Sequence, residues 1–138
     1  MNDRYVIDAS IGLAWVHPAQ ATPQTDELLD AVAAGAQVSV PALWFVEVAN
    51  ALLVLERRKK LKPDERAEAL STLRALNLTV DQEGHRLAFT KVSELASLHG
   101  LSAYDASYLE LALRERSPLA SKDAPLCAAA KKAGVRCR

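Results

Sequence analysis

The chain has 138 residues, half of them hydrophobic, which suits one compact domain with a sizeable core. Seventeen basic and seventeen acidic side chains give no formal net charge, a balance that is not typical of a strongly basic DNA-binding domain. This balance does not exclude a nucleic-acid substrate, because a metal ion and local basic patches can hold phosphates. No apolar run reaches membrane-spanning length and no signal peptide is recognisable, so we expect a cytoplasmic protein without membrane contact.

In the first half of the chain, short apolar runs alternate with stretches of helical periodicity. We expect, in order, a strand at 5–7, a helix at 9–15, a helix from Thr22 or Thr25 to about 34, a strand at 37–40, and a long helix from 42 or 43 to about 60. The long helix is apolar over more than one face, which predicts a central position. Its basic tail, residues 57–62, is typical of a solvated helix end facing the negative end of the helix dipole; an RNA-backbone contact is the alternative.

The second half continues the same alternation. We expect a helix from Pro63 to about 76, a strand at 78–80, helices at 83–99 and from Ser102 to about 116, a strand at 118–121, a helix at 124–133, and an edge strand at 135–137. Strands that alternate with helices indicate right-handed crossovers and a parallel sheet covered on both faces. The prediction is therefore a three-layer α/β/α fold around a parallel sheet of four to five strands, with residues 1–138 forming a single domain.

Four acidic residues stand at the predicted junctions between strands and helices. Asp8 follows the first strand, Glu47 lies in the early turns after the second, Asp105 is in the first turn of its helix, and Asp123 follows the fourth strand. In a parallel sheet, ligands bind outside the carboxyl ends of the strands, near the point where strand order reverses. Any one of these acids is ordinarily a helix cap or dipole partner, but four on one rim would repel one another strongly.

A hard divalent cation would remove that repulsion. Mg²⁺ or Mn²⁺ takes oxygen ligands and keeps several waters, so we predict that the four acids hold such an ion and are catalytic. Three further polar residues, each close in sequence to an acid, are predicted to orient the ligands from behind: Ser10, Asn50 and Ser121.

Other polar residues are given structural roles. Glu110 lies nearly one and a half turns beyond Asp105 and is expected to face solvent. Cys127 and Cys137 match no zinc-site spacing, so we expect free thiols in a reducing cytosol. The three histidines are scattered without a linking spacing, and none is expected to be catalytic.

This pattern resembles the PIN-domain ribonucleases, and most closely the VapC-type toxins of toxin–antitoxin pairs. The similarity spans nearly the whole chain, and its matching segments occur in the family's order: Tyr5-Val-Ile-Asp-Ala-Ser10, Val40-Pro-Ala-Leu-Trp44, Glu47-Val-Ala-Asn-Ala-Leu52, His99-Gly-Leu-Ser-Ala-Tyr-Asp105, and Pro118-Leu-Ala-Ser-Lys-Asp123 with residues 128–135. The family's acidic residues map onto the same four acids. Its usual threonine after the last strand is Ser121 here, which keeps the hydroxyl.

The resemblance implies a PIN-like fold and an endoribonuclease that depends on Mg²⁺ or Mn²⁺ and hydrolyses RNA phosphodiester bonds with activated water. It also implies a homodimer, inhibited by a VapB-type antitoxin whose tail occupies the acidic groove and which supplies most of the DNA binding. One alternative is a PIN-like module that binds RNA or a protein without cutting. A receiver-type phosphoacceptor is the other, but Asp3 lies at the wrong end of the first strand and Lys122 is only a nominal match for its lysine.

Overall fold

The computed structural model describes residues 3–138, and its centre is a four-stranded parallel sheet with strand order β3-β2-β1-β4. The strands are β1 (Arg4–Ile7), β2 (Gln37–Val40), β3 (Thr79–Val80) and β4 (Leu119–Ala120). The chain moves outward from β1 through β2 to β3 and then returns to the other side of β1 for β4. The reversal of strand order therefore falls between β1 and β4, and this is where an α/β sheet ordinarily binds its ligand.

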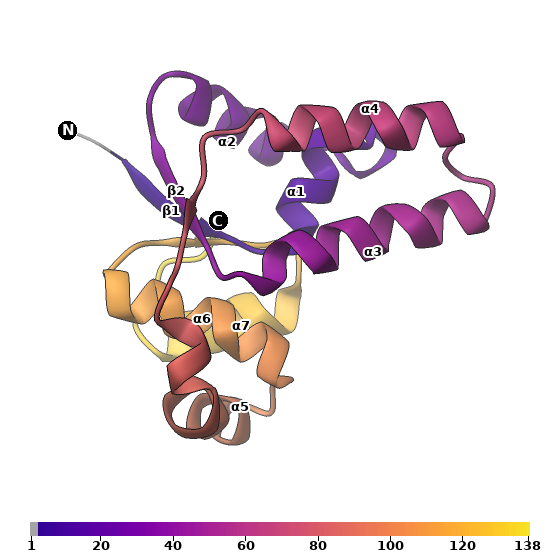
Figure 1. Ribbon diagram of the computed structural model, residues 1–138. Coiled ribbons are helices and arrows are strands. Elements are labelled where there is room, and N and C mark those ends of the chain that lie inside the picture. Colours follow the sequence, from indigo (N-terminus) through magenta and orange to yellow (C-terminus); the bar gives the residue numbers. More distant parts are fainter. Residues whose placement is uncertain (1–2) are drawn as a thin grey trace.

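Helices cover both faces of this sheet, with α1 to α4 on one side and α5 to α7 on the other (Figure 1). Their bounds are α1 Ala9–Val16, α2 Pro23–Ala33, α3 Leu43–Arg57, α4 Pro63–Arg74, α5 Ser93–His99, α6 Ala103–Glu115 and α7 Ala124–Lys132. The α/β class and the four parallel strands predicted from the sequence are confirmed. No helix among residues 3–138 combines the length and the apolar character needed to cross a membrane.

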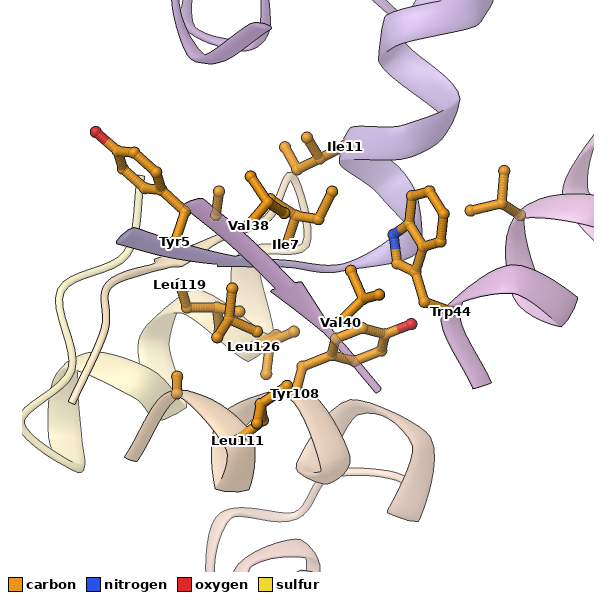
Figure 2. Close-up of a cluster of buried hydrophobic side chains, with 14 of the residues drawn as sticks. Tyr5, Ile7, Ile11, Val38, Val40, Trp44, Tyr108, Leu111, Leu119 and Leu126 are labelled. Carbon is orange, nitrogen blue, oxygen red and sulfur yellow. The ribbon is translucent and has the colours of Figure 1, made fainter. Parts of the chain in front are cut away.

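The core packs against the end of β1 from both sides of the sheet (Figure 2). Trp44, at the start of α3, is 1% exposed, and its indole N–H donates to the backbone oxygen of Asp8 at 3.0 Å. Gly12 of α1 fits beneath the same ring, where an added Cβ would lie 2.5 Å from an indole carbon. The contact leaves no room for a larger residue at position 12, and with the indole hydrogen bond it holds the start of α3 against α1, beside Asp8.

Three elements differ from the sequence expectation. Helix α3 is not central: it runs beside α4 as a hairpin projecting from the sheet (Figure 1), and Val46 on its outer face is 71% exposed. The expected helix at 83–99 is divided into a 3₁₀ turn at Gly84–Leu87, a π-helical turn at Ala88–Val92, and α5. The expected edge strand at 135–137 is reduced to one parallel bridge between Leu119 and Cys137.

The prediction of free thiols is wrong, because Cys127 and Cys137 form a disulfide. The chain turns back after α7 at Gly134, whose φ of +87° is open to glycine at little cost. The returning segment then lies along the outer edge of β4, where Leu119 N–H donates to Arg136 O and Arg138 N–H donates to Leu119 O. The sequence showed two cysteines ten residues apart but not this turn, which brings them together.

Reduction of the disulfide should destabilise the fold. The bond closes a loop of about ten residues, which corresponds to roughly 2–3 kcal/mol of unfolding free energy. Thermal unfolding with and without reductant measures the effect, and a variant with both cysteines replaced by alanine is the matched control, since it should not respond to reductant. Two free thiols in the denatured, unreduced protein would contradict the assignment.

Candidate active site

Asp8 emerges from the end of β1 and is only 6% exposed. Its Oδ1 accepts hydrogen bonds from the Ser10 amide at 3.0 Å and from the Ser10 hydroxyl at 2.5 Å. Its Oδ2 accepts one from the hydroxyl of Ser121, which follows β4. Both oxygens are thus held in place, one by donors at the start of α1 and the other by the loop after β4, and the carboxylate also caps α1.

The two serines also connect the loop after β4 to the end of β1. Ser10 Oγ accepts the Lys122 amide at 2.9 Å, and Ser121 Oγ accepts the Asp123 amide at 2.9 Å. Asp123 in turn caps α7, because its Oδ1 accepts the Leu126 amide at 3.2 Å. These bonds bring Asp123 to the same edge of the sheet as Asp8, although the two residues are far apart in sequence.

Glu47 and Asp105 reach this edge from opposite faces of the sheet. Asp105 lies in the first turn of α6, where Ser102 caps the helix by accepting the Asp105 amide at 3.0 Å. Tyr108, one turn further along α6, donates its hydroxyl to Glu47 Oε1 at 2.5 Å. Figure 2 shows the Tyr108 ring packed in the core with its hydroxyl directed toward the start of α3. Helix α6 therefore supplies one acid and orients another.

Tyr108 is the residue of this site that sequence analysis missed. Tyr108 lies three residues after Asp105, so both are on one face of the helix, and this spacing could have identified it as part of the site. Burial, followed by the hydrogen bond to Glu47, raises the pKa of the Tyr108 phenol above its usual range. The hydroxyl therefore stays protonated and acts as a donor to the Glu47 carboxylate.

The four acids act on one another electrostatically. Burial raises the pKa of Asp8, and burial followed by repulsion from Asp8 raises that of Glu47. The pKa of Asp105 rises to about 6, first through burial and then through repulsion from Asp123, Asp8 and Glu47. The carboxyl groups at the β1/β4 edge thus repel one another, and no salt bridge among residues 3–138 involves any of the four.

A second group of acids nearby is arranged differently. Arg114 of α6 makes two hydrogen bonds of 2.8 Å to Asp81 and two of 2.9 Å to Glu110. The hydrogen bonds from Arg114 lower the pKa of Asp81, whereas the pKa of Asp105 is raised. The expectation that Glu110 faces solvent is wrong: it is 5% exposed, and Arg114, one turn further along α6, pairs with its buried carboxylate.

The remaining predicted residue, Asn50, is exposed on α3, and no hydrogen bond from its side chain to the rest of residues 3–138 is found. Ser10 and Ser121 thus contact an acid directly, whereas Asn50 does not. Within the described chain, no three acidic, histidine or cysteine side chains already form a metal cage. The donor set nevertheless suits Mg²⁺ or Mn²⁺, because these ions bind one or two carboxylates directly and reach the others through water.

These features define a class of protein: a parallel α/β domain with unneutralised carboxylates at the point where strand order reverses. Residues 5–132 match the family model of the PIN domain, and the chain belongs to that family. A search of curated proteins finds no match.

Three solved structures are similar to this chain over nearly its whole length. PAE2754 from Pyrobaculum aerophilum has a TM-score of 0.72 at 22% identity, covering 99% of this chain and 90% of that one. VapBC2 from Rickettsia felis, bound to a promoter DNA fragment, has a TM-score of 0.67 at 13% identity, with 98% and 97% covered. FitAcB from Neisseria gonorrhoeae has a TM-score of 0.59 at 16% identity, with 96% and 95% covered. At these identities the likeness establishes the shared fold.

Replacing Tyr108 by phenylalanine should weaken binding of Mn²⁺ by about tenfold, because Glu47 loses the donor that orients it. Calorimetric titration measures the affinity. Tyr104→Phe is the matched control, since Tyr104 lies one turn earlier in α6 with its side chain exposed. Equal affinities for both variants and the wild type would show that the hydroxyl does not position Glu47 for a metal.

The raised pKa of Asp105 predicts how the metal-free fold depends on pH. A carboxyl whose folded-state pKa exceeds its unfolded value binds its proton more tightly when folded, so stability falls as pH rises from 3.8 to about 6 and stays lowered above that window. Asp105→Asn should therefore raise the melting temperature above pH 6 in the presence of chelator, and much less below pH 4. A melting temperature that this substitution lowers equally at both ends of the window would contradict the repulsion.

Proposed function

We propose that this protein is an endoribonuclease that requires Mg²⁺ or Mn²⁺ and serves as the toxin of a VapBC-type toxin–antitoxin pair, with residues 1–138 forming one PIN domain. The observation that carries the proposal is the concentration of four carboxylates without a basic partner at the β1/β4 switch point. Two acids elsewhere in the fold, Asp81 and Glu110, are by contrast ion-paired with one arginine, Arg114. Carboxylates that lack a basic partner at the edge where such sheets bind ligands indicate a site for a cation.

The proposed roles follow from the contacts of each side chain. Asp8, Asp105, Asp123 and Glu47 would hold the ion directly or through water, and a bound divalent ion supplies water activation and charge stabilisation in phosphodiester hydrolysis. Ser10 and Ser121 fix the Asp8 carboxylate, and Tyr108 fixes that of Glu47. Asn50 is on the same helix as Glu47 and is exposed, so we propose that it contacts substrate or a metal-bound water rather than a ligand carboxylate.

Two observations support protein partners. The similar structure from Rickettsia felis is named VapBC2, which denotes a pair of proteins, and it is bound to promoter DNA. In addition, five large apolar or aromatic side chains of this chain are exposed: Phe45, Val46, Phe89, Leu98 and Tyr104. Association with a partner would cover such side chains. We propose that they contribute to a homodimer interface and to the binding of a VapB-type antitoxin, whose tail would lie along the acidic edge.

The test is cleavage of RNA with Mg²⁺ and with Mn²⁺, followed by chelator and by Asp8→Asn. Cleavage should require the ion, and Asp8→Asn should reduce kcat by about 100-fold or more, because the loss of even an indirect metal contact costs 10–100-fold. The matched control is Asp26→Asn, which removes an exposed acid of α2 and should leave kcat unchanged.

The outcomes separate this proposal from the alternative of a non-cutting PIN-like module. Cleavage that persists in Asp8→Asn at the wild-type rate, in preparations shown to be free of a contaminating nuclease, defeats the proposal. RNA binding without cleavage at any metal concentration would support the binding module instead.

A further inference from the structure

The turn between α3 and α4 carries a concentrated positive charge. Residues 56–66 contain six basic and three acidic side chains in a chain with no net charge. Arg57, Arg58, Lys59, Lys60 and Lys62 are all exposed there. Figure 1 shows that this turn forms the far tip of the hairpin that projects from the sheet. We call these five residues the basic tip.

Ion pairing within the hairpin does not neutralise the basic tip. The acid nearest to it on α3, Glu56, pairs with Arg66 of α4 at 2.8 Å. Glu65 accepts the Lys62 backbone amide at 2.8 Å and so begins α4. No salt bridge among residues 3–138 includes a member of the basic tip. Glu56 thus pairs with a cation outside the basic tip and Glu65 bonds a backbone amide, so neither pairs with a charged side chain of the tip.

Lys59, at the centre of the basic tip, has an unusual backbone conformation for a residue with a side chain. Lys59 has a φ of +59°, in the left-handed region where glycine is usual. The amide of Lys60 donates to Leu55 O and that of Lys59 to Glu56 O, both at 2.9 Å, which is the bond pattern of a helix terminus ordinarily closed by glycine. Besides Arg116, the other left-handed positions in the described chain are glycines: Gly35, Gly100 and Gly134.

Compensation of the helix dipole explains only part of this charge. Cations in the last turn of a helix are favourable, and Arg57 and Arg58 already occupy that position in α3. A glycine at 59 would close the helix with less strain, and Lys60 and Lys62 lie beyond the helix end. The charge therefore extends past what the helix itself requires, which points to an anionic ligand.

The position of the basic tip relative to the acids decides which anion fits. Glu47 and Arg57 lie on the same helix, ten residues apart, which is about 15 Å along its axis. Without a bound metal ion, the carboxylates of the acidic edge repel the phosphates of a polyanion. Contacts outside that edge must therefore supply most of the affinity for a long polyanion. A strand whose reacting phosphate lies at the acids can follow α3 and place phosphates several nucleotides away against the basic tip.

From this geometry we infer that the basic tip binds the RNA backbone at a distance from the cleaved bond and sets the affinity for long substrates. The inference rests on the proposed ribonuclease function, because it takes RNA as the substrate. It assigns the basic tip a role in binding and none in the chemical step.

Binding is best measured in the Asp8→Asn background, by anisotropy of a labelled single-stranded RNA of about 16 nucleotides over a range of salt. The tip variant combines Arg57→Gln, Arg58→Gln and Lys60→Gln. Its Kd should rise about tenfold at low salt, and the slope of log K against log salt should flatten by about 0.7 for each phosphate that the variant no longer neutralises. The matched control neutralises three exposed cations in the last turn of α7 and just after it, Lys131, Lys132 and Arg136. It should change neither the Kd nor the salt slope.

Lys59→Gly separates binding from folding. It relieves the left-handed backbone at that residue, so the melting temperature should stay the same or rise, while RNA affinity should fall by about threefold because one cation no longer faces a phosphate. If the fold gains stability and RNA affinity does not change, the charge at 59 has no role in RNA binding.

The inference is overturned if the tip variant binds RNA as the wild type does, or if it loses affinity for duplex DNA but not for RNA. Cleavage by the enzyme with Asp8 restored then separates the two proposals. In the tip variant, KM should rise for the long RNA but not for one of about four nucleotides, with kcat unchanged. Weakened RNA binding together with an absence of cleavage in the wild type would remove the ribonuclease proposal and leave the RNA-binding tip intact.

Discussion

The structure around the candidate site depends on how the buried carboxylate of Asp8 is held. Its oxygens accept hydrogen bonds from Ser10 and Ser121, and its backbone oxygen accepts the indole N–H of Trp44. These donors belong to α1, to the loop after β4, and to α3. One residue at the end of β1 therefore fixes the relative position of the segments that carry Asp123 and Glu47. An acid held this firmly and without a cation is costly in isolation, and a bound metal would offset that cost.

Sequence analysis succeeded where local patterns determine the structure. Asp8, Asp105 and Asp123 each stand at the start of a helix, and the topology of a parallel sheet places such positions at one edge. The strand alternation and the helix caps at Thr22 and Ser102 were equally accessible, because they depend on residues close in the chain.

It failed where contacts between distant segments decide the outcome. Glu110 is buried because Arg114 joins it to Asp81, a residue that follows another strand. The disulfide depends on the turn at Gly134, which brings the end of the chain back along β4. The outer position of α3 goes with its packing against α4, and its second apolar face, including Val46, is exposed. None of these features has a periodic signature in the sequence.

The distribution of charge gives the neutral chain two distinct regions. Repelling carboxylates gather at the β1/β4 edge, whereas cations gather at the far end of the α3–α4 hairpin. The proposed nuclease would use both, since the acids would bind a metal ion and the cations would hold a polyanion that the acids otherwise repel. Helix α3 contributes Glu47 to one region and Arg57 to the other, so their separation is fixed by a rigid element.

The central claim is that Asp8, Asp105 and Asp123 form one cation site, and the most direct measurement is anomalous diffraction from crystals grown with Mn²⁺. The account predicts an anomalous peak between these three carboxylates, and its loss in crystals of Asp105→Asn. A peak elsewhere on the surface, or none at this edge at Mn²⁺ concentrations that saturate the protein in solution, would contradict it.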